Sequence, residues 1–136
     1  LRLYPPQWLV TRAASQPFEL GGHALPANTE VLVCPYLIHR DRRWWSDPDR
    51  FDPGRWLGRD QPHGRHAYLP FGAGPRVCPG SLLATVQLTV LTTLLARDYD
   101  LDLPPLASVR PSTDGLMLPA GLTGTWRARA RSRTGA

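Results

Sequence analysis

The chain of 136 residues contains no lysine, a single methionine and two cysteines. Two cysteines form one disulfide at most, which excludes the disulfide-rich class of small secreted proteins. The apolar stretch from Gly80 to Ala96 is rich in threonine and falls short of the ~20 residues that a membrane-spanning helix needs. No signal-peptide pattern opens the sequence. We therefore expect a cytoplasmic protein that does not enter the membrane.

The composition fits a folded protein with much irregular structure. Apolar residues make up 42% and charged residues 20%, which argues against wholesale disorder. Fifteen prolines and twelve glycines predict many turns. All sixteen basic residues are arginine, and the net charge of +5 favours acidic partners.

The first half of the chain predicts a small antiparallel sheet. Residues 1–6 have the pattern of a last helical turn ended by prolines. Residues 18–20 and 23–25 flank Gly21-Gly22, a two-residue hairpin turn. Residues 30–33, with three apolar residues after Glu30, predict a further strand that Pro35 ends. Residues 39–67 have no clear period, and we expect large aromatic side chains to fix this segment by packing: Trp44, Trp45, Phe51 and Trp56.

The second half predicts one long helix and a final hairpin. Apolar residues surround most of the helix from Ser81 to Ala96, so we expect it to be largely buried. Residues 100–111 form a polar connection. Residues 116–118 and 122–126 flank a proline–glycine turn, the pattern of a hairpin. Residues 127–136 form a basic tail.

The richest chemistry lies in the stretch from Phe71 to Gly80. It places Cys78 on a glycine-rich loop beside Arg76 and just before the long helix. The positive end of the helix dipole favours a thiolate there, and the thiolate is the metal-binding form of cysteine. The alternative is a glycine-rich turn around a buried structural cysteine. Cys34 follows an apolar strand and is expected to pack as a small hydrophobe rather than to pair with Cys78.

This stretch resembles the haem-ligand loop of the cytochromes P450, whose pattern is Phe-x-x-Gly-x-Arg-x-Cys-x-Gly. Every fixed position is filled, namely by Phe71, Gly74, Arg76, Cys78 and Gly80. The resemblance implies that Cys78 is the axial ligand of the iron in haem b and that Arg76 pairs with a haem propionate. It implies that Phe71 shields the sulfur. Gly74 and Gly80 would allow a positive φ or a close approach of the backbone to the haem.

Two further motifs occur in the order that this family has them. Arg2 resembles the arginine of the Glu-x-x-Arg motif, whose glutamate would precede Leu1. Pro53-Gly54-Arg55-Trp56 resembles Pro-Glu-Arg-Phe, with glycine in place of glutamate and tryptophan in place of phenylalanine. The resemblance implies that Arg2, Arg55 and the glutamate form a buried triad. The alternative for Arg55 is an ordinary surface arginine.

Other positions are assigned by the same resemblance. Arg12 matches a propionate-binding arginine, with a solvated arginine as the alternative. His39 is interpreted as structural rather than as a ligand. Five residues match positions that face the substrate, with plain core packing as the alternative: Gln7, Trp8, Leu9, Gly115 and Leu116.

Taken together, residues 1–136 resemble the C-terminal third of a single P450 domain, truncated before Leu1. The implied fold is α+β and mainly helical in the intact protein; this part would carry small antiparallel sheets, the irregular segment called the meander, the cysteine loop and one long buried helix. The implied activity is that of a haem-thiolate monooxygenase, which inserts one oxygen atom of O₂ into an apolar small molecule.

The implied electron donor is a ferredoxin or flavodoxin with its NAD(P)H reductase. The donor would dock near Cys78. An acidic donor is favoured by five arginines, namely Arg40, Arg42, Arg43, Arg59 and Arg65. The alternative is that these arginines form an ordinary solvated surface.

Two alternative functions belong to other classes. The chain, as it stands, would be a catalytically silent fragment of a P450. More remotely, the arginine-rich tail would make it a nucleic-acid-binding module, although no nucleic-acid-binding fold signal accompanies the tail. The four histidines and two cysteines have no zinc-site spacing, which argues against a metal site other than haem.

Overall fold

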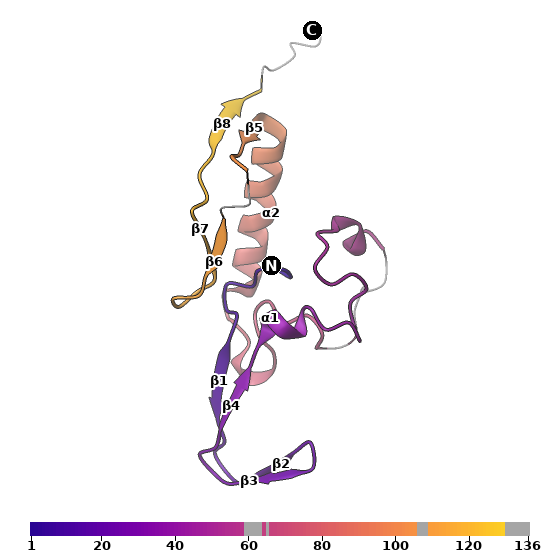
Figure 1. The fold of residues 1–136 in the computed structure, drawn as a ribbon, viewed down its shortest axis with the longest axis vertical. Coiled ribbons are helices and arrows are strands. Elements are labelled where there is room, and N and C mark those ends of the chain that lie inside the picture. The colour runs from indigo at the N-terminus through magenta and orange to yellow at the C-terminus, as the bar shows by residue number, and fades with distance from the viewer. Residues whose placement is uncertain (59–63, 65, 106–108, 130–136) are drawn as a thin grey trace. The chain divides into compact units, whose positions relative to one another are not determined.

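The computed structural model describes residues 1–58, 64, 66–105 and 109–129 (Figure 1). The chain forms two compact units. The first comprises residues 1–70 and 113–118, and the second comprises residues 71–112 and 119–136. The haem-loop motif opens the second unit, whereas Arg2, Arg12 and Arg55 belong to the first.

The first unit contains the antiparallel strands that the sequence predicts. β1 (Val10–Ala13) pairs with β4 (Glu30–Val33), with Val10 opposite Val33. β2 (Phe18–Leu20) and β3 (His23–Leu25) form the hairpin between them. Gly21 and Gly22 have φ values of 58° and 82°, which the two-residue turn requires and glycine adopts without strain. The predicted hairpin is confirmed.

An irregular segment follows, and its core is aromatic. It holds a single helical turn, α1 (Pro35–Ile38), and a short 3₁₀ helix, η1 (Pro53–Trp56). Trp45 is 1% exposed, and its ring centroid lies 6.1 Å from Trp56 and 6.3 Å from Tyr68. Trp45 therefore fixes this segment as expected. Phe51, at 80% exposure, does not, and that expectation is wrong.

Residues 1–6 are not helical, so the helical turn expected there is wrong. Helical N–H groups bond to carbonyls four residues earlier, and Pro5 and Pro6 have no N–H to donate. The backbone bends instead, and Arg2 and Pro5 are buried in the first unit.

The second unit is built around α2 (Ser81–Asp98), which confirms the predicted helix. A 3₁₀ turn, η2 (Gly74–Arg76), precedes it, and β5 (Tyr99–Asp102) follows directly. β8 (Thr125–Ala128) pairs antiparallel with β5, with Tyr99 opposite Ala128. β6 (Arg110–Ser112) pairs with β7 (Leu118–Ala120). The predicted final hairpin is therefore wrong, because its two arms pair with strands from the supposed connection 100–111.

The sides of α2 are exposed within this chain. None of its residues is buried, and Leu82 and Leu83 are 76% and 62% exposed. Among the strands, the helix contacts β5, which follows it directly and is too small to cover an apolar surface that surrounds most of the helix. The expectation of a buried helix is thus not met by these 136 residues. Among the described residues, no helix is both long and apolar enough to cross a bilayer.

Part of the predicted basic tail belongs to the second unit. Arg127 lies in β8 and pairs with Asp102 at 2.5 Å, and Arg129 pairs with Asp100 at 2.7 Å. Arg129 also donates to the Ala96 carbonyl near the end of α2 at 2.8 Å. These two arginines have acidic partners of their own. The remainder of the tail, including Arg131 and Arg133, lies outside the described residues.

Candidate functional site

The loop that carries Cys78 is closed by backbone hydrogen bonds. The Cys78 N–H donates to the Phe71 carbonyl at 2.9 Å, and the Val77 N–H donates to the Gly74 carbonyl at 3.0 Å. Gly74 has a φ of 70°, in the left-handed region where a Cβ atom is strained. The chain therefore turns back on itself and presents the Cys78 side chain to the surface, where the thiol is free and exposed.

Gly80 serves a different purpose from Gly74. Its φ of −84° is open to any residue, so it is not needed for backbone freedom. A Cβ atom at this position would lie 3.8 Å from Cys78 Sγ. That distance is an ordinary van der Waals contact, so Gly80 is required here neither by its φ nor by a clash with Cys78, and its approach to the haem stays a prediction.

Cys78 lies immediately before the N-terminus of α2, whose N-cap is Gly80. The Ser81 N–H donates to the Cys78 carbonyl at 3.2 Å, which connects the loop to the first turn of the helix. The first N–H groups of a helix point outward and carry the positive end of its dipole.

Arg76 lies on the same loop and is exposed. In the described part of the chain its guanidinium makes neither a hydrogen bond nor an ion pair. Phe71 is half-buried at the start of the loop. A free thiol next to a helix N-terminus and an unpaired cation match an iron porphyrin that carries carboxylates, because the metal needs a soft ligand and the carboxylates need a cation. The donor set of this loop thus fits haem.

Arg12 lies on β1, opposite Val31, and is exposed. Its hydrogen bond within the described residues is local, from Nη1 to the neighbouring Thr11 carbonyl at 2.8 Å. Its charge has no acidic partner among the described residues. Arg12 therefore also remains available to an anionic group.

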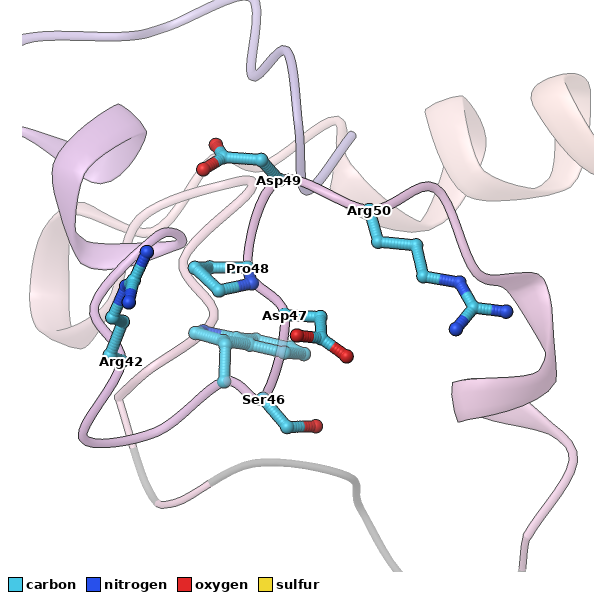
Figure 2. Close-up of a pocket in the computed structure, with 7 residues that line it drawn as sticks. Arg42, Ser46, Asp47, Pro48, Asp49 and Arg50 are labelled. Carbon is cyan, nitrogen blue, oxygen red and sulfur yellow. The ribbon is translucent and has the colours of Figure 1, made fainter.

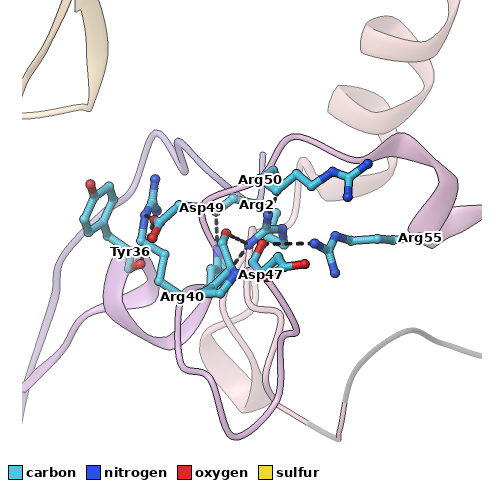
Figure 3. A network of polar contacts seen from close by, with 9 residues as sticks. Arg2, Tyr36, Arg40, Asp47, Asp49, Arg50 and Arg55 are labelled. Atoms are coloured by element: carbon cyan, nitrogen blue, oxygen red, sulfur yellow. Dashed lines mark hydrogen bonds and ion pairs between the residues drawn. The ribbon is translucent and has the colours of Figure 1, made fainter.

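Arg2 is the centre of the first unit's polar network (Figure 3). It is 7% exposed and donates to three backbone carbonyls at 2.6–2.9 Å, those of His39, Pro48 and Arg50. Its guanidinium also stacks 4.9 Å from the Trp45 ring centroid. Burial lowers the pKa of Arg2, and the positive charge of Arg55 lowers that pKa further.

Arg55 approaches the same network from η1. Its Nη2 donates to the Asp47 carbonyl at 3.1 Å and its Nη1 to Ser46 Oγ at 3.3 Å, while its Nε is buried without a partner. Among the described residues, no carboxylate pairs with Arg2 or Arg55. Arg55 Nε is a buried donor that lacks an acceptor, and the positive charges of Arg2 and Arg55 repel each other. A carboxylate beside them would accept the free N–H and offset this repulsion.

His39 is fully buried and bonded through both ring nitrogens. Nε2 accepts the Leu69 N–H at 2.7 Å, so Nδ1 carries the proton and donates to the Arg2 carbonyl at 3.0 Å. Burial lowers the pKa of His39 to about 4. A neutral histidine used in this way is structural, as the sequence analysis interprets it.

The structure brings together the two segments expected to face substrate, although they lie 107 residues apart. Trp8 Nε1 donates to the Gly115 carbonyl at 3.1 Å, and the Met117 N–H donates to the Pro6 carbonyl at 2.7 Å. Gln7 is bonded within its own segment, from Nε2 to the Leu9 carbonyl at 2.7 Å. Leu116 is 51% exposed.

The arginines expected to dock an electron donor differ in their surroundings. Arg40 pairs with Asp49 at 3.2 Å and lies 3.8 Å from the Tyr36 ring centroid, and Arg43 pairs with Asp41 at 2.5 Å. These pairings reduce the charge that the two arginines offer to a partner. Arg59 and Arg65 lie outside the described residues.

Arg42 lines a pocket that the sequence did not reveal. The pocket has a volume of about 340 Å³, and Figure 2 shows Arg42, Asp47 and Arg50 arranged around Pro48. Its lining mixes both charges within residues 42–50, a stretch without periodicity, so no sequence signal indicated it.

Comparison with known proteins agrees with this geometry. The family model of the cytochrome P450 family matches residues 1–124. Cyclooctatin synthase of Streptomyces melanosporofaciens is 41% identical over 112 residues, which are 82% of this chain and 24% of that protein. Pentalenene oxygenase of Streptomyces avermitilis is 36% identical over 112 residues, 82% of this chain and 25% of that protein. A zebra fish cytochrome P450 solved with progesterone has a TM-score of 0.81 and 32% identity, covering 94% of this chain and 29% of that one.

The chain therefore belongs to the cytochrome P450 family, and it spans about a quarter of the length of the curated relatives that it matches. The family and the fold that the three motifs indicated are confirmed. The roles of the individual site residues remain predictions.

Proposed function

We propose that this chain supplies the thiolate side of a haem-thiolate monooxygenase, with Cys78 as the axial ligand of haem b. The observation that carries the proposal is the closed loop from Phe71 to Cys78, which presents a free, exposed thiol at the N-terminus of α2. The described residues use this thiol for no structural purpose. Membership of the P450 family supports the same assignment.

The residues around Cys78 would each have a distinct task in this site. When bound, the haem would supply the activation of O₂, assisted by electron donation from the thiolate. Arg76 and Arg12 would neutralise the propionates, since neither has an acidic partner among the described residues. Gly80 would keep the sulfur accessible, and Phe71 would limit its contact with water.

Arg2 and Arg55 would stabilise the scaffold rather than touch the haem. Arg2 is already bonded to three carbonyls, and Arg55 Nε is buried without a partner. We propose that a carboxylate from a segment that precedes Leu1 completes this arrangement, as the glutamate of the Glu-x-x-Arg motif would. The carboxylate would remove the repulsion between the two arginines and accept the free N–H.

The substrate would be an apolar small molecule, and cyclic terpenoids are our first candidates. Two relatives are named cyclooctatin synthase and cyclooctat-9-en-7-ol 5-monooxygenase, and a third is named pentalenene oxygenase. The electrons would come from a ferredoxin or flavodoxin with its NAD(P)H reductase. Arg42, which has no acidic partner among the described residues, offers positive charge to such an acidic donor.

We also propose that residues 1–136 do not form a working enzyme by themselves. The exposed leucines of α2 would leave a large apolar surface in water, which folded monomers rarely tolerate. Haem binding and turnover would therefore need the surfaces that cover this helix.

Cysteine substitutions test the assignment directly, because Cys34 provides a matched control. Both cysteines are free, and Cys34 follows β4 in the first unit. In the protein expressed with any coding sequence that precedes Leu1, we expect Cys78→Ser to abolish thiolate ligation of the iron, measured in the absorption spectrum after haem loading, and to stop oxidation of a terpenoid substrate. Cys34→Ser should leave both unchanged. Equal behaviour of the two variants would refute Cys78 as the ligand.

A further inference from the structure

His39 holds a backbone N–H that lies 30 positions later in the chain. The histidine directly follows α1 and is fully buried. Its Nδ1 donates to the Arg2 carbonyl at 3.0 Å, and its Nε2 accepts the Leu69 N–H at 2.7 Å. A carbonyl can only accept and an amide N–H can only donate, so these two partners fix one neutral tautomer of the ring. Burial lowers the pKa of His39 to about 4, which keeps the ring neutral at neutral pH.

The Leu69 N–H depends on this side chain because its own segment has no regular structure. Residues 67–69 belong to neither a helix nor a strand, so no ladder of backbone carbonyls serves them. The other end of the segment is held by a side chain as well, since Trp45 Nε1 donates to the Ala67 carbonyl at 3.1 Å. His39 therefore fixes the last residue of a segment that is anchored at both ends.

A short and stiff stretch of backbone connects Leu69 to the cysteine loop. Only Pro70 lies between Leu69 and Phe71, where the loop begins. The proline ring fixes the φ of Pro70 and restricts the backbone of the residue before it. The Phe71 carbonyl then accepts the Cys78 N–H at 2.9 Å. Two hydrogen bonds and three successive residues thus connect His39 Nε2 to the residue that carries the thiol.

We infer that His39 is a positioning residue for Cys78 and acts through the N–H of Leu69. The inference rests on the proposed function, in which Cys78 is the iron ligand. His39 is not itself a ligand, because both of its ring nitrogens are already bonded. Without an acceptor at Nε2 the Leu69 N–H loses its partner, and the backbone that leads into Phe71 gains freedom. The sulfur would then be held less firmly at the axial position of the iron.

Two substitutions at His39 separate its two bonds. In His39→Asn the side-chain amide N–H takes the place of Nδ1 and still donates to the Arg2 carbonyl, but nothing replaces Nε2. In His39→Gln the amide oxygen takes the place of Nε2 and accepts the Leu69 N–H, but the donor to Arg2 is lost. Each variant loses one bond, so a role in stability alone predicts similar effects of both on the loop.

The first readout needs no haem. It is hydrogen exchange of the Cys78 amide in the haem-free protein, expressed with any coding sequence that precedes Leu1. The Ala14 amide, bonded to the Thr29 carbonyl at 3.0 Å in the same unit as His39, reports general loosening and serves as the reference. Relative to this reference, exchange at Cys78 should be about fivefold faster in His39→Asn, the factor that corresponds to one hydrogen bond of ordinary strength. It should be unchanged in His39→Gln.

The second readout is the absorption spectrum of the same protein after haem loading, reduction and addition of carbon monoxide. We expect the fraction of haem bound through a thiolate to fall by about threefold in His39→Asn, since one hydrogen bond that holds the loop is lost, and to be retained in His39→Gln. If His39→Asn does not fold, Leu69 is replaced by its α-hydroxy acid, which exchanges the N–H for an ester oxygen and leaves His39 intact. That replacement should reproduce both effects.

The outcomes separate this inference from the proposed function. Thiolate-bound haem in the unmodified protein, with equal effects of His39→Asn and His39→Gln on both readouts, would overturn the positioning role alone. A larger effect of His39→Gln would also overturn it, because the bond to Arg2 would then carry the effect. Failure of the unmodified protein to bind haem through a thiolate would overturn the proposed function and, with it, the role of His39 toward the iron ligand.

Discussion

Arg2 and His39 are bonded to each other twice. The Arg2 guanidinium donates to the His39 carbonyl at 2.8 Å, and His39 Nδ1 donates to the Arg2 carbonyl at 3.0 Å. Both residues are buried, and His39 Nε2 accepts the N–H of Leu69, two residues before the cysteine loop begins. The side chains of Arg2 and His39 thus join three parts of the chain that lie far apart in sequence.

We predict that Arg2→Lys lowers the free energy of unfolding of the first unit by about 2–4 kcal/mol, because a single ammonium cannot serve three carbonyls in the geometry of a planar guanidinium. Denaturant unfolding measures this change. Arg12→Lys, at an exposed arginine with one local hydrogen bond, is the control and should stay within about 0.5 kcal/mol of the unmodified protein. Equal effects of the two substitutions would contradict the account of Arg2.

Stability should fall in acid because of His39. Its pKa is lowered to about 4 in the fold from an ordinary value of 6.5. Between these pH values the unfolded chain binds a proton that the folded chain does not, so the free energy of unfolding decreases as the pH drops from 6.5 to about 4. The contribution, about 3 kcal/mol, is fully present above pH 6.5.

The measurement is the denaturant midpoint as a function of pH, with His23→Gln as the control at an exposed histidine of β3. That variant should keep the full acid dependence. His39→Gln should be less stable at neutral pH and should lose the part of the slope between pH 6.5 and about 4. An unchanged slope in His39→Gln would mean that other groups cause it.

The two glycines of the cysteine loop should respond differently to alanine. Gly74→Ala places a side chain at φ 70° and should cost about 1 kcal/mol of stability. Gly80→Ala introduces no such strain, but it adds a methyl group 3.8 Å from Cys78 Sγ. We therefore expect Gly80→Ala to be the milder change in denaturant unfolding and the more harmful one in haem binding. The reverse order in both assays would refute these roles.

Arg76 offers a way to separate function from structure. It is exposed and has no partner among the described residues, so Arg76→Gln should change the stability of the haem-free protein by less than about 0.5 kcal/mol. Haem affinity should nevertheless fall by roughly tenfold, which corresponds to about 1.4 kcal/mol for a lost charge pair. Haem titration measures it. A loss of stability with haem affinity retained would assign Arg76 to the scaffold.

The parts of the fold that could be predicted from sequence were those with local causes. Gly21-Gly22 dictates its turn by itself, and the apolar pattern of α2 needs no partner to be recognised. The pairing of β5 with β8 was missed because it joins strands more than twenty positions apart. Tyr99-Asp100-Leu101-Asp102 does alternate as strands do, but Pro104 and Pro105, which follow, favour an irregular connection.

The same contrast between local and long-range causes applies to the residues of the candidate site. A contiguous motif predicted the Cys78 loop, because its spacing carries the chemistry within ten residues. The Trp8–Gly115 bond could not be predicted, since no pattern in either segment refers to the other. The pairings of Arg40 and Arg43 with nearby aspartates likewise depend on rotamers, which a charge count does not contain.

The most direct test of the central claim is the carbon monoxide difference spectrum of the reduced, haem-loaded protein, expressed with any coding sequence that precedes Leu1. We predict the red-shifted Soret band that thiolate ligation produces, lost in Cys78→Ser and retained in Cys34→Ser. Bound haem without that band, or a band that survives Cys78→Ser, would contradict Cys78 as the iron ligand and with it the assignment of the site.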